Sequence, residues 1–209
     1  MRIPLGTWFV TWLIVPQLFA WAQCDQWRIL NESGSKATRD LRYNEATGEY
    51  TKAVEAAQQY RCGPTPIVIS MISVADIYHV QGRYRQSEQL FLKAKGLIEQ
   101  VPVQVRARGT EATLLNELAD LYLDLARYND AQQLARQAID IRRQFSLKNP
   151  QSVISIVTLA EADLAQGKTS DAEALLREEM AASKKGLEWV RGGLEMRLAG
   201  ILASQGHQG

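Results

Sequence analysis

The sequence has few of the residues on which catalytic and metal sites depend. Only two histidines and two cysteines occur in 209 residues. No Cys or His pair has the close spacing of zinc ligands, and no glycine-rich phosphate loop is present. A nucleophile paired with a base is also missing. We therefore predict no cofactor, no metal site and no enzymatic activity, and we interpret His79 as a surface side chain.

Proline and strand-forming patterns are also scarce. The chain has six prolines, and few segments alternate β-branched with polar residues. Ala, Leu, Gln, Glu and Arg are abundant instead, and these residues favour helices. The sequence therefore predicts an all-α fold from about residue 26 onward.

Neither sign of charge is in excess. The chain carries 24 basic and 23 acidic residues, and the first 22 residues hold one charge, on Arg2. Without those residues the formal charge is zero. Because phosphate binding requires a basic face, nucleic acid is not expected as a partner.

The first 22 residues differ in composition from the rest. Arg2 is followed by an apolar stretch from Leu5 to Val15, and Ala20 and Ala22 flank Trp21. This order is typical of a cleavable signal peptide, so we predict export to the periplasm or outside the cell, without membrane attachment after cleavage. The alternatives are a retained membrane anchor, a lipid anchor on Cys24, or a buried first helix.

The two cysteines, Cys24 and Cys62, both follow the predicted signal peptide. An even number of cysteines in an exported chain favours a disulfide bond between them. Two unpaired thiols are the alternative.

Similar short segments recur along the chain at positions that suit turns between helices. They centre on Gly48, Gly82, Ala126 and Gly167, and a fifth follows at Gly206. The intervals, from 48 to 82 to 126 to 167 to 206, are 34, 44, 41 and 39 residues. Repeats of this period indicate a solenoid.

The flanks of these turns also repeat. A small residue and a bulky one stand before the turn, where they would let two helices approach closely. The pairs are Ala75 and Tyr78, Ala119 and Tyr122, Ala160 and Asp163, and Ala199 and Leu202. After two of the turns an apolar stripe follows, made of Ser87, Phe91 and Ala94 and of Ala131, Ala135 and Ala138.

These residues resemble the tetratricopeptide repeat. The segment from Ile69 to Pro102 matches its pattern most fully, and Ala138 to Val153 is similar to the longer variant of kinesin light chains. The resemblance covers about residues 45 to 206 and implies a short right-handed superhelical solenoid of antiparallel helix pairs, with four hairpins and a terminal half-repeat. The implied domains are a signal peptide (1–22), an N-terminal segment (23–45) and a repeat domain (46–209). A non-repetitive helical bundle is the alternative.

The resemblance also implies a function in protein binding, on a concave face lined by the first helix of each hairpin. Aligned turns place a carboxylate at the same position in three copies, among apolar and polar neighbours. The predicted partner-binding residues are Ile72, Asp76, His79, Asn116, Asp120, Leu123, Val157, Glu161 and Leu164. This face predicts that the partner is a peptide or segment with basic and apolar residues. The basic residues with which other members of the family bind C-terminal carboxylates are missing here, so that kind of ligand is not expected. A solenoid around a small-molecule pocket, an enzyme, or a fragment of a larger repeat protein are the alternatives.

Overall fold

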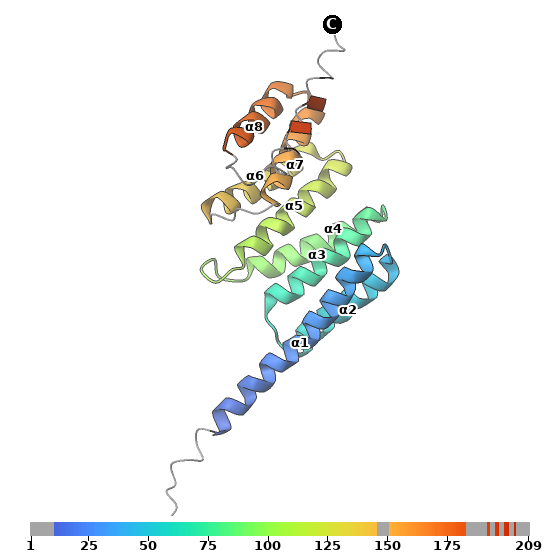
Figure 1. The fold of residues 1–209 in the computed structure, drawn as a ribbon, viewed down its shortest axis with the longest axis vertical. Helices are drawn as coiled ribbons and strands as arrows, with labels where there is room; N and C mark the ends of the chain where they lie inside the picture. Colours follow the sequence, from blue (N-terminus) through green and yellow to red (C-terminus); the bar gives the residue numbers. More distant parts are fainter. Residues whose placement is uncertain are drawn as a thin grey trace, which may run out of the picture. The chain divides into compact units, whose positions relative to one another are not determined.

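The computed structural model describes residues 11–145 and 151–182, together with single positions between 192 and 203. This part of the chain contains α-helices and no strand, as predicted (Figure 1). The helices are α1 (Thr11–Arg39), α2 (Tyr43–Gln59), α3 (Pro64–Val80), α4 (Tyr84–Glu99), α5 (Arg108–Asp124), α6 (Tyr128–Gln144), α7 (Gln151–Ala165) and α8 (Thr169–Ala182). No helix within the described ranges has both the length and the hydropathy needed to cross a membrane.

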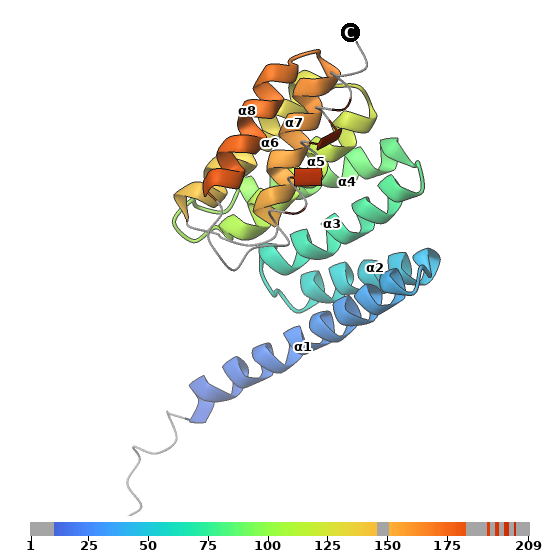
Figure 2. The ribbon, with the colours of Figure 1, turned by 45° about the horizontal axis from the view of Figure 1, so that its top comes forward.

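Consecutive helices pack as antiparallel hairpins, α1 with α2, α3 with α4, α5 with α6, and α7 with α8 (Figures 1 and 2). The chain divides into two compact units, Met1–Pro102 and Val103–Gly209. We call them unit 1, which holds α1 to α4, and unit 2, which holds α5 to α8. Each unit therefore contains two complete hairpins, and the predicted arrangement of paired helices is confirmed.

Each hairpin turns at one residue with left-handed backbone geometry. These residues are Leu41 (φ 58°), Gly82 (φ 70°), Ala126 (φ 55°) and Gly167 (φ 75°). In every copy the residue that follows donates its backbone N–H to a carbonyl five residues back, at 2.8 or 2.9 Å. This bond satisfies a carbonyl that the end of the first helix leaves unpaired.

The predicted turn at Gly48 is wrong. Gly48 lies inside α2, and the first turn is at Leu41, so the intervals from 41 to 82 to 126 to 167 are 41, 44 and 41 residues. The spacing of Gly48 and Tyr50 is the same as that of Gly82 and Tyr84, which made Gly48 look like a turn residue. The actual turn residue is Leu41, and leucine rarely adopts a positive φ. Part of the segment 23–45, expected to precede the repeats, forms the first helix and turn of the first hairpin.

The corrected register shows why the hairpins pack closely. Seven residues before each turn the first helix has Gly34, Ala75, Ala119 or Ala160, and five residues after it the second helix has Ala46, Ser87, Ala131 or Ala172. All eight are buried. Small side chains at both positions let the two helix backbones approach each other.

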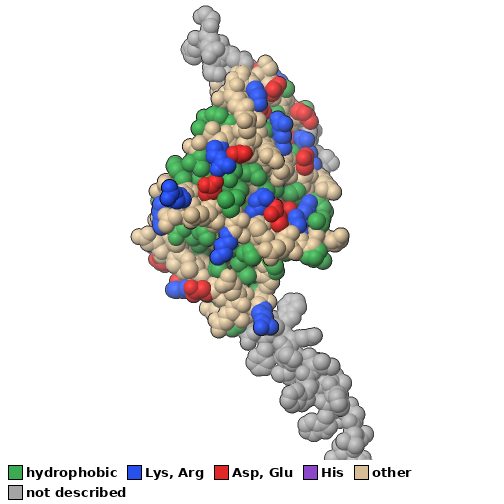
Figure 3. Space-filling model, turned by 180° about the vertical axis from the view of Figure 1, so that it is seen from behind, with side chains coloured by type: hydrophobic (Ala, Val, Ile, Leu, Met, Phe, Trp, Pro, Cys, Tyr) green, Lys and Arg blue, Asp and Glu red, His purple; other side chains and the backbone are tan. Residues whose placement is uncertain are grey.

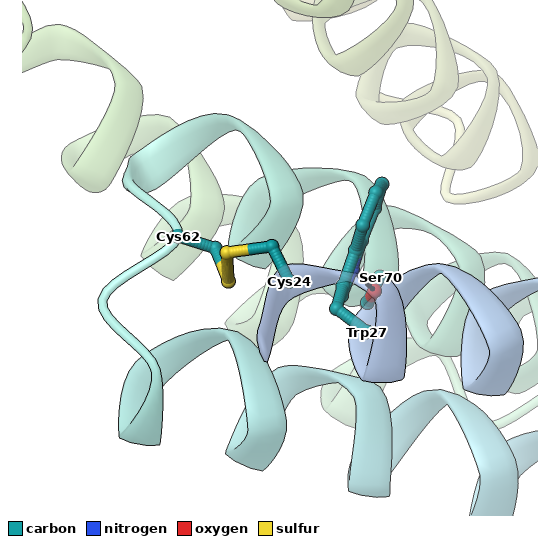
Figure 4. Close-up of a disulfide and its surroundings, with 4 residues drawn as sticks. All are labelled: Cys24, Trp27, Cys62 and Ser70. Carbon is teal, nitrogen blue, oxygen red and sulfur yellow. Dashed lines mark hydrogen bonds between the residues drawn. A yellow bond between two sulfur atoms is a disulfide. The ribbon is translucent and has the colours of Figure 1, made fainter. Parts of the chain in front are cut away.

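A disulfide joins α1 to the segment after α2. Cys24 and Cys62, 38 residues apart in sequence, are bonded, as predicted (Figure 4). Trp27 lies one helical turn further along α1 and donates its indole N–H to Ser70 of α3 at 2.9 Å. The start of unit 1 is thus held by a covalent bond and by a hydrogen bond between hairpins.

Two predicted segments lie wholly or mainly outside the described residues. These are the first ten residues of the predicted signal peptide and most of the predicted last helix, Gly193 to Ser204. Both stay predictions.

Candidate functional site

The predicted binding residues lie on the first helices of three hairpins. Ile72, Asp76 and His79 are on α3 of unit 1; Asn116, Asp120 and Leu123 are on α5 of unit 2; Val157, Glu161 and Leu164 are on α7 of unit 2. Their spacing of three and four residues places each trio on one side of its helix. Since α5 and α7 contact each other, the two trios of unit 2 lie on neighbouring helices.

The exposure of these residues is uneven. Ile72 and Asn116, which hold the same position in their repeats, are buried, with 6% and 2% of their surface exposed. The other seven are half-buried. Ile72 is therefore part of the packed core of unit 1, and Asn116 is likewise enclosed in unit 2. The other seven residues keep part of their surface exposed.

The corrected register adds three residues of α1 that the sequence analysis missed. Asn31, Ser35 and Thr38 hold the positions of Ile72, Asp76 and His79. Ser35 accepts a hydrogen bond from Arg39 at 3.0 Å, and no carboxylate stands at this position of α1. Carboxylates at this repeat position therefore occur on α3 of unit 1 and on α5 and α7 of unit 2. An alignment that allowed a non-glycine turn residue would have found these positions.

Unit 1 has a chain of hydrogen bonds between its two first helices. Trp27 donates to the hydroxyl of Ser70 (Figure 4). This hydroxyl donates in turn to Oδ1 of Asn31 at 3.0 Å. Ser70 is fully buried, and its partners Trp27 and Asn31 are half-buried. The bonds satisfy their polar atoms and fix α1 against α3.

In unit 2 the first helices are strongly acidic. Together α5 and α7 contain six Asp or Glu residues and one basic residue, Arg108. Glu111 is paired with Arg106 and Arg108 at 2.7 and 2.6 Å, so its charge is compensated at the start of α5. Two other acidic residues, Asp120 and Glu161, are half-buried among the predicted binding residues.

Charges of both signs occur together on the face that Figure 3 draws. There Lys and Arg side chains lie between Asp, Glu and hydrophobic side chains, without gathering into one basic area. This distribution contrasts with the acidic composition of α5 and α7.

Two tyrosines before the turns are covered by arginines. The guanidinium of Arg83 lies 4.0 Å from the centre of the Tyr78 ring, and that of Arg127 lies 3.9 Å from the Tyr122 ring. Both pairs occupy the same repeat positions. In each, a cation–π contact joins the residue after the turn to the tyrosine before it.

Comparison with known proteins agrees with this geometry. Residues 110–185, which contain most of α5 and all of α6, α7 and α8, match the family model of the tetratricopeptide repeat. Over these residues the chain is similar to tetratricopeptide repeats. No curated protein sequence matches the chain.

Solved structures extend the likeness to both units. A Podosopora anserina protein with kinesin light chain TPR-like repeats is 19% identical, with a TM-score of 0.70, and 86% of each chain is covered. BtubC from P. vanneervenii is 16% identical, with a TM-score of 0.68 over 88% of this chain and 85% of that one. The apo form of RapI is 13% identical, with a TM-score of 0.65 over 84% and 69%. At these identities the likeness shows the fold, which is TPR-like.

The last tetratricopeptide hairpin departs from the pattern at its turn. Asp163 replaces the tyrosine and is 4% exposed. It accepts a hydrogen bond from the side-chain amide N–H of Gln132 in α6 at 2.6 Å. The amide oxygen of Gln132 accepts a hydrogen bond from Lys168 at 3.5 Å. Burial raises the pKa of Asp163, although Arg136 and Lys168 oppose the shift. A buried carboxyl thus takes the place of an aromatic ring between α6 and α7.

Proposed function

We propose that this protein is an extracytoplasmic interaction module that binds a partner protein or peptide on the first helices of its hairpins. The fold supports this function because tetratricopeptide repeats typically serve as binding modules rather than enzymes. The observation that carries it is the composition of α5 and α7, where carboxylates recur at one repeat position among half-buried apolar side chains. A surface that is only solvated has no need of Leu123, Val157 and Leu164 at these places.

The proposed location outside the cytoplasm is supported by two features. The first 22 residues have the composition of a signal peptide, and the two cysteines of the chain form a disulfide. Disulfides persist in oxidising compartments and are rare in the cytosol.

The chemistry of the face suggests the class of partner. Carboxylates at a fixed interval favour a segment with Lys or Arg, and the apolar side chains between them favour apolar anchors. Opposite charge would set the register of the segment, while burial of its apolar side chains would supply affinity.

Charge reversal on unit 2 tests this function. Asp120→Lys combined with Glu161→Lys should reduce capture of crosslinked partners from an envelope or secreted fraction at least about tenfold, because two attractions become repulsions. The matched control is Asp140→Lys with Glu178→Lys, which changes the net charge equally at exposed positions of the second helices α6 and α8. The control should capture the same partners as the wild type, as quantified by mass spectrometry.

Equal capture by the double variant and the wild type, with an unchanged helical circular dichroism spectrum, would contradict the proposed face. The interface would then be sought around Arg83 and Arg85 of unit 1 or around Arg127 and Arg136 of unit 2.

A further inference from the structure

The turns of the two units follow the same register. The turn residues Leu41 and Gly82 of unit 1 correspond to Ala126 and Gly167 of unit 2, because 126 − 41 and 167 − 82 are both 85. With the same offset, Asn31 corresponds to Asn116 and Ser70 to Ser155. The polar pair between the first helices of unit 1 is therefore repeated in unit 2, residue for residue.

The third member of the unit 1 chain is not repeated. Trp27, which donates its indole N–H to Ser70, corresponds to Ala112, since 27 + 85 is 112. An alanine side chain has no donor. Unit 2 thus retains the Asn and Ser of this chain but lacks the indole that, in unit 1, donates to the serine hydroxyl.

The pair in unit 2 is left with unused hydrogen-bonding atoms. Asn116 and Ser155 are 2% and 0% exposed, and neither Oδ1 of Asn116 nor Oγ of Ser155 has a hydrogen-bond partner. Buried polar atoms without partners are rare, and each costs free energy until a donor or acceptor reaches it. In unit 1 the corresponding atoms are bonded to each other and to Trp27.

We propose that a Lys or Arg side chain of the bound partner supplies the missing donor to Asn116 and Ser155. This inference rests on the proposed function of the α5 and α7 face and names the chemistry at its centre. Asp120 follows Asn116 by one helical turn on α5, and Glu161 holds the equivalent position on α7. All these groups are able to accept hydrogen bonds, and the two carboxylates favour a cationic donor.

The depth of the pair favours a side chain over a backbone amide. Because Asn116 and Ser155 lie beneath the surface, the donor has to stand at the tip of a long, narrow group. Lys and Arg have such side chains, and their charge would be compensated by the neighbouring carboxylates. A tryptophan of the partner would reproduce the donor of unit 1 but not use the carboxylates.

Two variants of the full-length protein test the inference without changing the charge of the face. Ala112→Trp introduces in unit 2 the donor that Trp27 provides in unit 1. Asn116→Leu removes the unpaired acceptor at similar volume. The probes are fluorescein-labelled peptides that alternate Leu with Arg, Lys, Trp or Glu, and their binding is measured by fluorescence anisotropy. The matched control is Asn31→Leu, the same change in unit 1.

We expect the Arg or Lys peptide to bind the wild type most tightly. Both variants should weaken that binding about tenfold, the effect of losing one charge-assisted hydrogen bond, while Asn31→Leu changes it less than about twofold. If Ala112→Trp does not fold, Asn116→Leu decides the question. Asn116→Leu should also melt no lower than the wild type, since it removes an unpaired buried polar atom.

Four results would overturn the inference. Preference for the Trp peptide would assign the pair to an aromatic donor, and unchanged affinity in folded Asn116→Leu would assign it to internal packing or a bound water. Loss of binding in Asp120→Lys with Glu161→Lys, but not in Asn116→Leu, would leave the proposed function intact and remove only this site. If none of these variants alters peptide binding, the proposed face is also wrong.

Discussion

Gly34 shows how one residue sets the distance between two helices. A Cβ atom built on Gly34 would lie 2.8 Å from Cδ1 of Tyr50, and Tyr50 is itself packed in the core of unit 1 with Ala37 and Val74. The ring therefore has little room to move. Glycine costs helix stability elsewhere, but here its missing side chain admits a tyrosine of α2.

Two glycine-to-alanine changes should therefore have opposite effects. Gly34→Ala should destabilise the protein by about 1 to 3 kcal/mol, because the added methyl group overpacks the contact with Tyr50. Gly48→Ala, at a helical position of α2 with nothing within 4 Å, should stabilise it by up to about 1 kcal/mol. Chemical denaturation followed by circular dichroism measures both. A stabilised Gly34→Ala variant would show that Tyr50 yields more easily than its burial suggests.

The burial of Asp163 should make the stability of the protein depend on pH through this one carboxyl group. Burial raises its pKa in the folded protein above the ordinary value of 3.8, so folding favours the protonated form. The favourable contribution is present below the unfolded pKa and is lost as the pH rises through the folded pKa. Asp163→Asn, which keeps the acceptor for Gln132, should be about 1 kcal/mol more stable than the wild type at pH 7.

This advantage should disappear when the unfolding free energy is measured at or below the ordinary pKa. Asp171→Asn, an exposed change at the start of α8, serves as the control and should stay within about 0.5 kcal/mol of the wild type. A variant Asp163→Asn that is less stable than the wild type at pH 7 would mean that attraction to Arg136 and Lys168 outweighs the burial of the carboxyl.

At the scale of the element, the disulfide ties α1 to the end of the first hairpin. Its 38-residue separation closes a loop that is costly in chain entropy when the protein folds. Cys24→Ala with Cys62→Ala should lower the free energy of unfolding of unit 1 by about 3 to 4 kcal/mol on the chain-entropy model. Guanidinium denaturation of the oxidised protein and of the variant measures the difference. Mass spectrometry of the exported, non-reduced protein should find no free thiol, and two free thiols there would refute the bond.

The helices could largely be predicted from the sequence, because small and bulky residues recur at fixed distances from Gly82, Ala126 and Gly167. The first hairpin could not be placed, since Leu41 adopts a conformation that sequence alone assigns to glycine. This one error moved α1 out of the repeat alignment. It also hid Asn31 and Trp27, whose significance depends on the true register.

The candidate site could be predicted only in part for a different reason. Helical spacing correctly gathers Asp120, Leu123 and their neighbours on one side of α5, since that depends on local geometry. Burial of Ile72 and Asn116 depends on which helix packs against them, and amino-acid type does not determine it. Contacts between residues about 40 positions apart, such as Ser70 with Asn31 and Asp163 with Gln132, require the fold itself.

At the scale of the molecule, the predicted last helix would close the array of hairpins. Each repeat buries its apolar surface only against its neighbours, so the last hairpin needs a cover. Truncation before Leu194 should therefore lower the melting temperature and solubility, as measured by differential scanning fluorimetry and light scattering. An unchanged melting temperature and solubility would instead favour a longer native array.

The position of the disulfide has a consequence for how the protein matures. Both cysteines of the chain lie in unit 1, and unit 2 contains none. The two halves share one architecture, yet only the first depends on an oxidant to secure its opening helix. Arrival in an oxidising compartment would therefore complete the first half by forming its disulfide, whereas the half with the acidic helices has no disulfide to form.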